Sequence, residues 1–497
     1  MKRTLCTSVF LSVLILSIAS CSSDPEPHRA ADTTSAAAAA VTEAGTVLRE
    51  NTPDTLPSDL SFGGANVRIA AGGGEDIKMY EIGIDEAEGE IVIDALYDRN
   101  RKVEERLDVN LPHIYGNTLT YEFKNEIRNV LIAGDDAYDI IITHQSFGLP
   151  HALEGLYHNL SDAPYLDYDQ PWWNVDYMSQ IEISDHARFL LGGDICVFLL
   201  RNMGSMFFNK TLYESHFGNP DALYQLALDG NWTMDQLARM STEVFSDINQ
   251  DNRADLGDTV GLYTATVSTA DLFAYSAGLT LTERNADGYP VLVDDQSRNV
   301  DIMEGLKKLY FETPGVYVTP DPNDILSTGV ETFASGSVLF FPERFSRLHA
   351  LRDMSDPYGI LPYPKADEQQ AEYRTMIHDY ATLYAVPITL EDIDMPCAVL
   401  EAMCAENYRS VIPTYYEVAL KVKFTHDNIS AQVIDLIRDG ASTDFMYANN
   451  YYFSNAQLGI IQRDIITNQK EYMSTYTSME KTARKLLEEL VDQYRNS

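Results

Sequence analysis

Apolar residues in the first third of the chain alternate between short strand-like runs and longer helical stripes. Residues 65–71, 109–111 and 137–143 are short runs rich in apolar and β-branched side chains. Residues 91–107 and 121–132 instead repeat apolar side chains about once per helical turn. Strands that alternate with helices of this length predict a parallel sheet covered by helices on both faces.

The later part of the chain adds elements of both kinds. Residues 189–200 predict a strand pair that turns at 192–194, and Thr233 with Gln236 predicts a capping box at a helix start. Other strands are expected at 206–210, 336–341, 359–362 and 382–387, and other helices at 271–279, 303–311, 396–406, 429–438 and 472–495. From residue 62 onward the chain is too long for one hydrophobic core, so we predict an α/β fold with two lobes.

The first sixty residues differ in composition from this body. A basic start precedes an apolar run over residues 9–19, which is shorter than the roughly 20 apolar residues that span a bilayer. We therefore predict a signal peptide over residues 1–20. Residues 16–21 resemble a bacterial lipobox, in which Cys21 becomes the lipid-bearing terminus; the alternative is an ordinary secretory signal. Residues 21–61 hold few large apolar side chains, which predicts a lipidated flexible tether.

Charge and cysteine content narrow the function classes. The formal net charge of −39 would repel nucleic acid and anionic lipid surfaces, although acidity also keeps an exported protein soluble. Cys196 lies in an apolar run, which predicts a buried small residue. Cys397 and Cys404 lie seven residues apart on a predicted helix, roughly 10 Å apart, too far to bridge. The sequence shows no disulfide framework.

Several short motifs follow one another in a recognisable order. They are residues 133–135 with 138–141, then 208–210, 231–235, 333–341 and 358–362. Together with the lipobox, this order resembles the extracellular solute-binding lipoproteins of ABC importers, in the group that takes sugars and oligosaccharides. The resemblance implies a periplasmic-binding-protein-like fold of two α/β lobes, each a mostly parallel sheet flanked by helices, with a cleft between them. It also implies hinge crossings near residues 147, 375 and 428, with lobe I at 62–147 plus 376–428 and lobe II at 148–375 plus 429–497.

The same resemblance implies a function and its partners. The chain would capture an oligosaccharide in the interlobe cleft and deliver it to ABC permease subunits. It would act as a monomer, anchored through Cys21 to the outer face of the cell membrane, or in the periplasm if the host has two membranes. The alternatives are a receptor for a peptide or another polar solute, and a surface glycan-binding protein without a transport role.

Residues 247–258 carry the sharpest motif. Their oxygen-bearing groups follow the spacing of an EF-hand loop and come from Asp247, Asn249, Asp251, the carbonyl of Arg253, Asp255 and Asp258. Position 6 of the loop is Asn252 rather than glycine, and Asp258 is shorter than the usual glutamate. The pattern predicts a structural Ca²⁺; the alternative is a solvated turn held by Asx hydrogen bonds.

Candidate ligand-binding residues fall into two groups. Adjacent Trp172 and Trp173 on a polar loop could stack on the flat C–H faces of sugar rings, and Trp232 is a weaker candidate that could equally pack at a helix start. The others sit where predicted strands end or return, and ligands gather at such ends. They are Glu75, His144, Gln145, Arg201, Glu343, Arg344, Asp379 and Tyr380.

An enzyme is the rival class that the sequence disfavours. No nucleophile elbow, HExxH or SxxK motif is present. Paired carboxylates of a glycoside hydrolase cannot be placed among 75 acidic residues. The three glycines at 72–74 match neither a GxGxxG nor a P-loop pattern. We therefore expect a binding protein with no catalytic residues and no catalytic cofactor.

Overall fold

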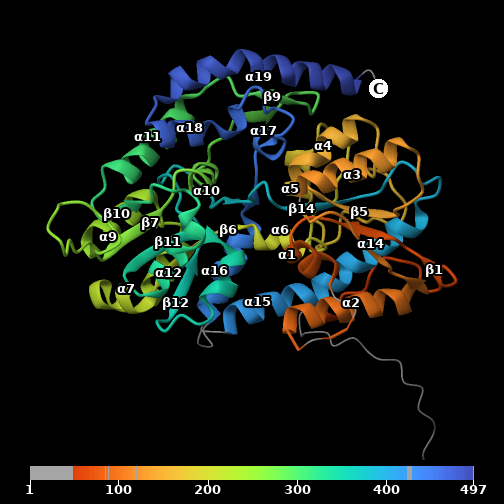
Figure 1. Ribbon diagram of the computed structural model, residues 1–497, viewed down its shortest axis with the longest axis horizontal. Helices are drawn as coiled ribbons and strands as arrows, with labels where there is room; N and C mark the ends of the chain where they lie inside the picture. The colour runs from red at the N-terminus through yellow and green to blue at the C-terminus, as the bar shows by residue number, and fades with distance from the viewer. Residues whose placement is uncertain (1–48, 84–85, 88, 119, 422–427, 496–497) are drawn as a thin grey trace, which may run out of the picture. The chain divides into compact units, whose positions relative to one another are not determined.

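The computed structural model describes residues 49–83, 86–87, 89–118, 120–421 and 428–495. The predicted signal peptide, the lipidation site Cys21 and the tether up to residue 48 lie outside these described residues. Two sheets dominate the rest, one of four strands and one of five (Figure 1). Within the described residues, no helix is both long enough and apolar enough to cross a membrane.

The four-stranded sheet has the order β14-β5-β2-β4. Its strands β2 (Ile69–Ala71), β4 (His113–Tyr115) and β5 (Ile140–His144) are parallel, and β14 (Thr382–Ala385) returns antiparallel to β5. The helices of this part include α2 (Ile91–Leu107), α3 (Thr120–Ile132), α4 (Gln145–Leu153) and α14 (Asp394–Glu406). The predicted helix at 91–107 is confirmed, because Glu90 caps its first turn and the apolar stripe is buried.

The predicted first strand is divided in two. The sequence predicts one strand over residues 65–71, but β1 (Ala65–Asn66) pairs with β3 (Val109–Asn110) in a separate ribbon, and only β2 joins the larger sheet. Arg68 lies at the division, where its backbone N–H donates to the Asp139 carboxylate at 2.6 Å. The neighbour of β2 in the sheet is therefore β4 and not the predicted strand at 109–111.

The five-stranded sheet has the order β10-β7-β11-β6-β12. Strands β10 (Val316–Val318), β7 (Val260–Thr264) and β11 (Val338–Arg344) are parallel, whereas β6 (Gly204–Asn209) runs antiparallel to β11 and to the edge strand β12 (Tyr358–Leu361). The predicted edge strand at 359–362 is confirmed. The helices around this sheet include α7 (Lys210–Phe217), α8 (Asp221–Leu228), α9 (Met234–Val244), α11 (Ser297–Phe311), α12 (Thr328–Ala334) and α16 (Asn428–Asp439).

The predicted strand pair at 189–200 is wrong. Residues 189–193 form no regular strand, a turn follows at 194–195, and the chain then forms the short helix α6 (Val197–Arg201), which lies between the two sheets (Figure 1). Gly193 packs so tightly on the preceding loop that an added Cβ would lie 2.4 Å from the Trp172 carbonyl oxygen. The segment therefore pairs with that loop and, through Leu191, with Tyr384 of β14, instead of folding back on itself.

Other segments connect the two sheets in the region around α6, called the junction below. The two-residue strand β13 (Thr375–Met376) pairs with β15 (Ala441–Ser442) and leads through residues 377–381 into β14. The other helices of the described chain include α1 (Glu75–Ile77), η2 (Lys78–Ile82), α5 (Val175–Ile181), α10 (Ser268–Ser276), η5 (Asn407–Val411), α15 (Ile412–Lys421), α17 (Phe445–Ala448), α18 (Ile461–Asn468) and α19 (Tyr472–Arg495). The predicted lobe boundaries stay a prediction.

The last part of the predicted tether is packed against the body. The Arg49 guanidinium donates to the Asp194 carboxylate at 3.1 Å, and Thr55 donates to Glu401 at 2.9 Å. Leu56 is buried, with 7% of its surface exposed. Residues 49–56 are thus held by side chains far away in the sequence, which the composition of this segment does not reveal.

Trp232 belongs to the core of the five-stranded sheet. Thr233 caps α9 by accepting from the backbone N–H of Gln236, as the sequence predicts. The Trp232 side chain is fully buried, its ring lies 5.3 Å from that of Phe340, and its Nε1 donates to the Pro362 carbonyl at 3.0 Å. This corrects the ligand-binding role considered for Trp232, because no face of the ring is left for a ligand.

We predict that Trp232→Ala lowers the free energy of unfolding by about 3–5 kcal/mol, since it leaves a cavity and orphans the Pro362 carbonyl. Ile248→Ala is the control, because Ile248 is 65% exposed and the change should stay within about 0.5 kcal/mol. Urea unfolding followed by circular dichroism measures both. Equal effects of the two substitutions would contradict this packing.

Candidate functional site

Residues from distant parts of the sequence meet where β5 ends. His144 is the last residue of β5, and its ring lies 5.0 Å from that of Tyr380, which precedes β14. The Tyr380 ring lies 5.9 Å from that of Phe198 on α6. Tyr380 is 38% exposed, so part of its ring can contact a ligand. Two predicted residues, His144 and Tyr380, are therefore neighbours here.

A second aromatic group extends this surface and encloses a lysine. The Lys124 Nζ lies 4.4 Å from the ring centres of Tyr121 and Tyr451 and 5.2 Å from that of Phe147. It also donates to the Tyr451 hydroxyl at 2.7 Å. Phe147 continues to His144 at 5.2 Å, and Tyr121 is 53% exposed. Tyr121, Lys124 and Phe147 are not among the ligand-binding residues predicted from the sequence, because an aromatic side chain in or near a predicted helix is more often part of the core.

Asp379 is the centre of a polar network beside Tyr380. It lies 3.0 Å from His378 Nδ1, accepts from Asn450 Nδ2 at 2.8 Å and lies 3.9 Å from the Arg463 guanidinium. Burial would raise the pKa of Asp379, but His378 and Arg463 together hold that pKa well below its ordinary value. The carboxylate therefore stays ionised.

Arg463 connects this network to Asp271. Its guanidinium pairs with the fully buried Asp271 carboxylate, which also accepts from Gln462 at 2.7 Å. Asp271 lies on α10 and Arg463 on α18, so both come from helices of the five-stranded part. Neither was a sequence candidate, because 192 residues separate them.

Glu343 and Arg344 end β11 beside the same network. One oxygen of the fully buried Glu343 accepts from Arg344 Nε at 3.2 Å and from Arg347 Nε at 3.1 Å. Its other oxygen, Oε1, has no hydrogen-bond partner among the described residues. Arg344 Nη1 donates to Asn202 Oδ1 at 3.2 Å. Burial opposes ionisation of Glu343, but the two arginines lower its pKa, so a charged acceptor is left with one oxygen unused.

Arg201 completes the junction at the end of α6. Its guanidinium lies 3.7 Å from the centre of the Tyr80 ring, and its Nη2 lies 3.5 Å from the Asp76 carboxylate. Only 5% of Arg201 is exposed, yet its Nε has no hydrogen-bond partner among the described residues.

Two other candidates from the sequence do not join this group. The side chain of Glu75 is outside the described residues, and Gln145 is buried, with its side-chain oxygen accepting from the Tyr177 hydroxyl.

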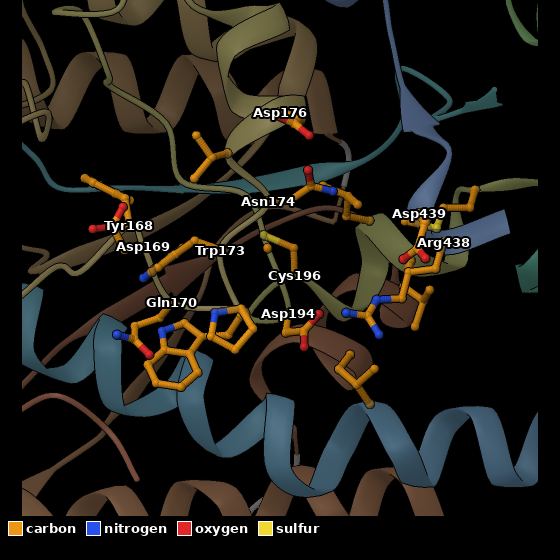
Figure 2. Close-up of a pocket in the computed structure, with 18 of the residues that line it drawn as sticks. Tyr168, Asp169, Gln170, Trp173, Asn174, Asp176, Asp194, Cys196, Arg438 and Asp439 are labelled. Atoms are coloured by element: carbon orange, nitrogen blue, oxygen red, sulfur yellow. The ribbon is translucent and has the colours of Figure 1, made fainter. Parts of the chain in front are cut away.

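Trp172 and Trp173 lie elsewhere. They help to line a pocket of about 480 Å³ that Leu199 and Leu200 of α6 also line. Figure 2 shows Asp194 and Arg438 pointing toward one another in this pocket. The prediction that one of the two tryptophans stacks on the ligand finds little exposed ring surface, because only 1% of Trp172 and 5% of Trp173 is exposed and Trp173 Nε1 donates to Glu401 at 2.9 Å.

The acidic loop is held by its own backbone. The Asp247 carboxylate accepts from the N–H groups of Gln250 at 2.6 Å and Asn252 at 2.8 Å, and Asn252 adopts the left-handed conformation expected at position 6, with φ 62°. Asp258 accepts from the N–H of Ile248 at 2.8 Å, so it faces the backbone. In the described part of the chain, no three His, Cys, Asp or Glu side chains are grouped to hold a metal ion. These contacts match the Asx turn, and the calcium site stays a prediction.

A buried carboxyl group fixes α6 at the junction. Glu81 of η2 accepts from the Phe198 N–H at 2.8 Å, the Thr382 hydroxyl at 2.6 Å and the Tyr384 hydroxyl at 2.9 Å. It is fully buried, and burial raises its pKa to about 7. The position of α6, and so of Phe198 and Arg201, depends on this carboxyl group.

We predict that Glu81 makes stability fall as pH rises. Because its pKa is raised in the folded state from 4.5 to about 7, the folded chain binds the proton more tightly than the unfolded chain between these values. Its contribution is therefore full below about pH 4.5 and lost by about pH 7, a change on the order of 3 kcal/mol. Urea unfolding of wild type and Glu81→Gln from pH 4.5 to 8 should show this loss in the difference between the two curves. Parallel curves would contradict it.

Calcium has a direct test at the acidic loop. If the ion binds, 1 mM calcium chloride should raise the melting temperature relative to chelator, since a ligand of the folded state stabilises it. Asp251→Asn should remove the rise, while Asp353→Asn, an exposed aspartate outside the loop, should keep it. No rise in the wild type would leave the Asx turn as the only role of the loop.

The junction thus offers aromatic faces beside ionised carboxylates, guanidinium groups and amides, a set suited to a polar ring that carries hydroxyl groups.

No family model matches the chain, and no curated relative matches it. Solved structures do. The GacH receptor of Streptomyces glaucescens, solved unliganded and with acarbose, is 13% identical over 86% of this chain and 99% of its own, with a TM-score of 0.54. UspC of M. tuberculosis is 14% identical over 85% and 100%, with a TM-score of 0.57. An ABC transporter solute-binding protein of Thermotoga lettingae, bound with alpha-D-tagatose, is 12% identical over 85% and 100%, with a TM-score of 0.51. The chain therefore has the two-lobed α/β fold of these solute-binding proteins, as its sequence predicts.

Proposed function

We propose that this chain is the extracytoplasmic solute-binding protein of an ABC importer and that it binds a saccharide where α6 meets the ends of β2 and β5. One observation carries the proposal: the partly exposed ring of Tyr380 lies beside the ionised Asp379, close to His144. A sugar needs both groups, since its C–H face stacks on an aromatic ring and its hydroxyls donate to carboxylates. Two structures of the same fold contain acarbose and tagatose, which supports this ligand class.

The proposed site uses groups from both parts of the fold. Tyr380 and His144 belong to segments of the four-stranded sheet, whereas Asn450 and Arg463 come from the C-terminal segments that pack with α10. A ligand that contacts both parts would favour the arrangement that brings them together, because only differential contact shifts such an equilibrium. This is how binding would signal to a permease.

Anchorage and transport belong to the same proposal. A lipid on Cys21 would hold the chain on the outer face of the membrane, and permease subunits would receive the ligand. The similar solved structures are binding proteins, which supports a role without catalysis. A peptide receptor and a glycan-binding protein without a transporter are the two alternatives that experiment must separate.

We predict that a saccharide raises the melting temperature of the tether-free chain. A ligand at 100 times its Kd adds about 2.7 kcal/mol, a rise of a few degrees. Mono- and oligosaccharides, peptides and polar metabolites form the panel. A response only to peptides would establish the alternative receptor and contradict the saccharide proposal.

Tyr380→Ala should then weaken saccharide binding about fivefold to tenfold, because a stacked aromatic ring contributes about 1 kcal/mol. Phe311→Ala is the matched control, since Phe311 is a similarly exposed aromatic residue at the end of α11. Isothermal titration calorimetry measures both. Unchanged affinity in Tyr380→Ala would place the ligand elsewhere.

A further inference from the structure

The charge of the junction differs from that of the chain. The chain has 36 lysines and arginines against 75 aspartates and glutamates. In the described residues at the junction, cationic side chains are instead at least as frequent as acidic ones. The cations are Lys124, Arg201, Arg344, Arg347 and Arg463, and the acidic side chains are Asp76, Glu81, Asp271, Glu343 and Asp379.

These cations differ in how well the protein neutralises them. Arg463 is paired with the buried Asp271, and Arg344 with the buried Glu343. Lys124 lies among three rings and donates to one hydroxyl, and in the described part of the chain no carboxylate pairs with it. A positive charge held by aromatic rings still attracts an anion.

Arg201 combines contacts to Asp76, Tyr80 and Tyr415 with one buried donor that has no partner among the described residues. Its Nε is buried without a hydrogen-bond partner in the described structure, and its Nη2 has a 3.5 Å contact with Asp76. The Asp76 side chain is 67% exposed, so it can leave this contact for water at little cost. A buried donor without a partner costs free energy that a ligand acceptor would recover. The Nε and Nη2 groups form the edge of a guanidinium that binds a carboxylate through two parallel hydrogen bonds.

We propose that the ligand is an acidic saccharide, and that its carboxylate takes the place of Asp76 on the Nε and Nη2 edge of Arg201. The inference rests on the proposed function and narrows it to sugars that carry a uronic acid. Lys124 adds positive charge nearby. A row of ring contacts runs from Phe147 beside Lys124 through His144 and Tyr380 to Phe198, which shares helix α6 with Arg201.

The test compares sugars that differ only in charge. Trigalacturonic acid and a trimer of mannuronic acid are each titrated beside their methyl esters, with maltotriose as a neutral sugar. We expect one acid to bind at least tenfold more tightly than its ester, and this ratio should shrink as sodium chloride is raised from 50 to 500 mM. Calorimetry on the tether-free chain gives each Kd.

Variants assign the effect to one residue. Arg201→Gln should weaken binding of the acid at least tenfold and leave that of the ester unchanged, while Arg201→Lys should retain part of the preference. Arg239→Gln is the control, because Arg239 is exposed on α9 and pairs with Glu243 of the same helix. If Arg201→Gln does not fold, the ratio of acid to ester in the wild type still decides the question.

The outcomes separate the two proposals. Equal binding of acid and ester, or binding of maltotriose alone, would overturn the acidic ligand and leave a saccharide receptor. An acid preference that persists in Arg201→Gln would overturn the role of Arg201. If no saccharide binds while a peptide or another solute does, the proposed function fails and this inference with it.

Discussion

The buried Glu81 carboxyl group ties together the segments on which the site depends. It bonds to the first turn of α6 and to two side chains of β14, so the helix between the sheets is fixed to the four-stranded sheet. Burying such a group is unfavourable unless its hydrogen bonds are satisfied. Here three donors satisfy it, and Arg99, itself fully buried, supports it by donating to the Glu81 carbonyl at 2.9 Å. The two faces of α6 then have different surroundings.

One face of α6 meets charge and exposed aromatic rings, and the other faces a pocket whose tryptophans are covered. The first face contains Phe198 and Arg201, which contact Tyr380 and Tyr80. Ionised side chains there are paired across segments distant in sequence. Burying these charges costs desolvation free energy, and apolar side chains could stabilise the fold without that cost. A binding role accounts for that cost. The pocket on the other face encloses about 480 Å³ and is lined by polar groups such as Asp194 and Arg438, but its two tryptophans are buried.

The sequence predicts what depends on local pattern and misses what depends on distant contacts. Helix α2 follows from its apolar stripe and its cap, and the edge strand β12 from its position before a proline-rich turn. Helix α6 is missed because residues 197–201 are almost uniformly apolar, so no period distinguishes helix from strand. Trp173 was assigned to a ligand because its neighbours in sequence are polar, whereas its partner Glu401 lies 228 residues away. His144, Asp379 and Tyr380 could be proposed because they lie at the ends of predicted strands. Asp271 and Arg463 could not, because they meet only in the folded chain.

Hydrogen–deuterium exchange with and without a bound saccharide would locate the ligand in the intact chain. Binding at the proposed site should slow exchange of backbone amides in residues 144–147, 198–202 and 378–380, which carry His144, Arg201 and Tyr380. Protection confined to residues 168–176 and to the end of α16 would place the saccharide in the pocket on the other face of α6. That result would contradict the site described above.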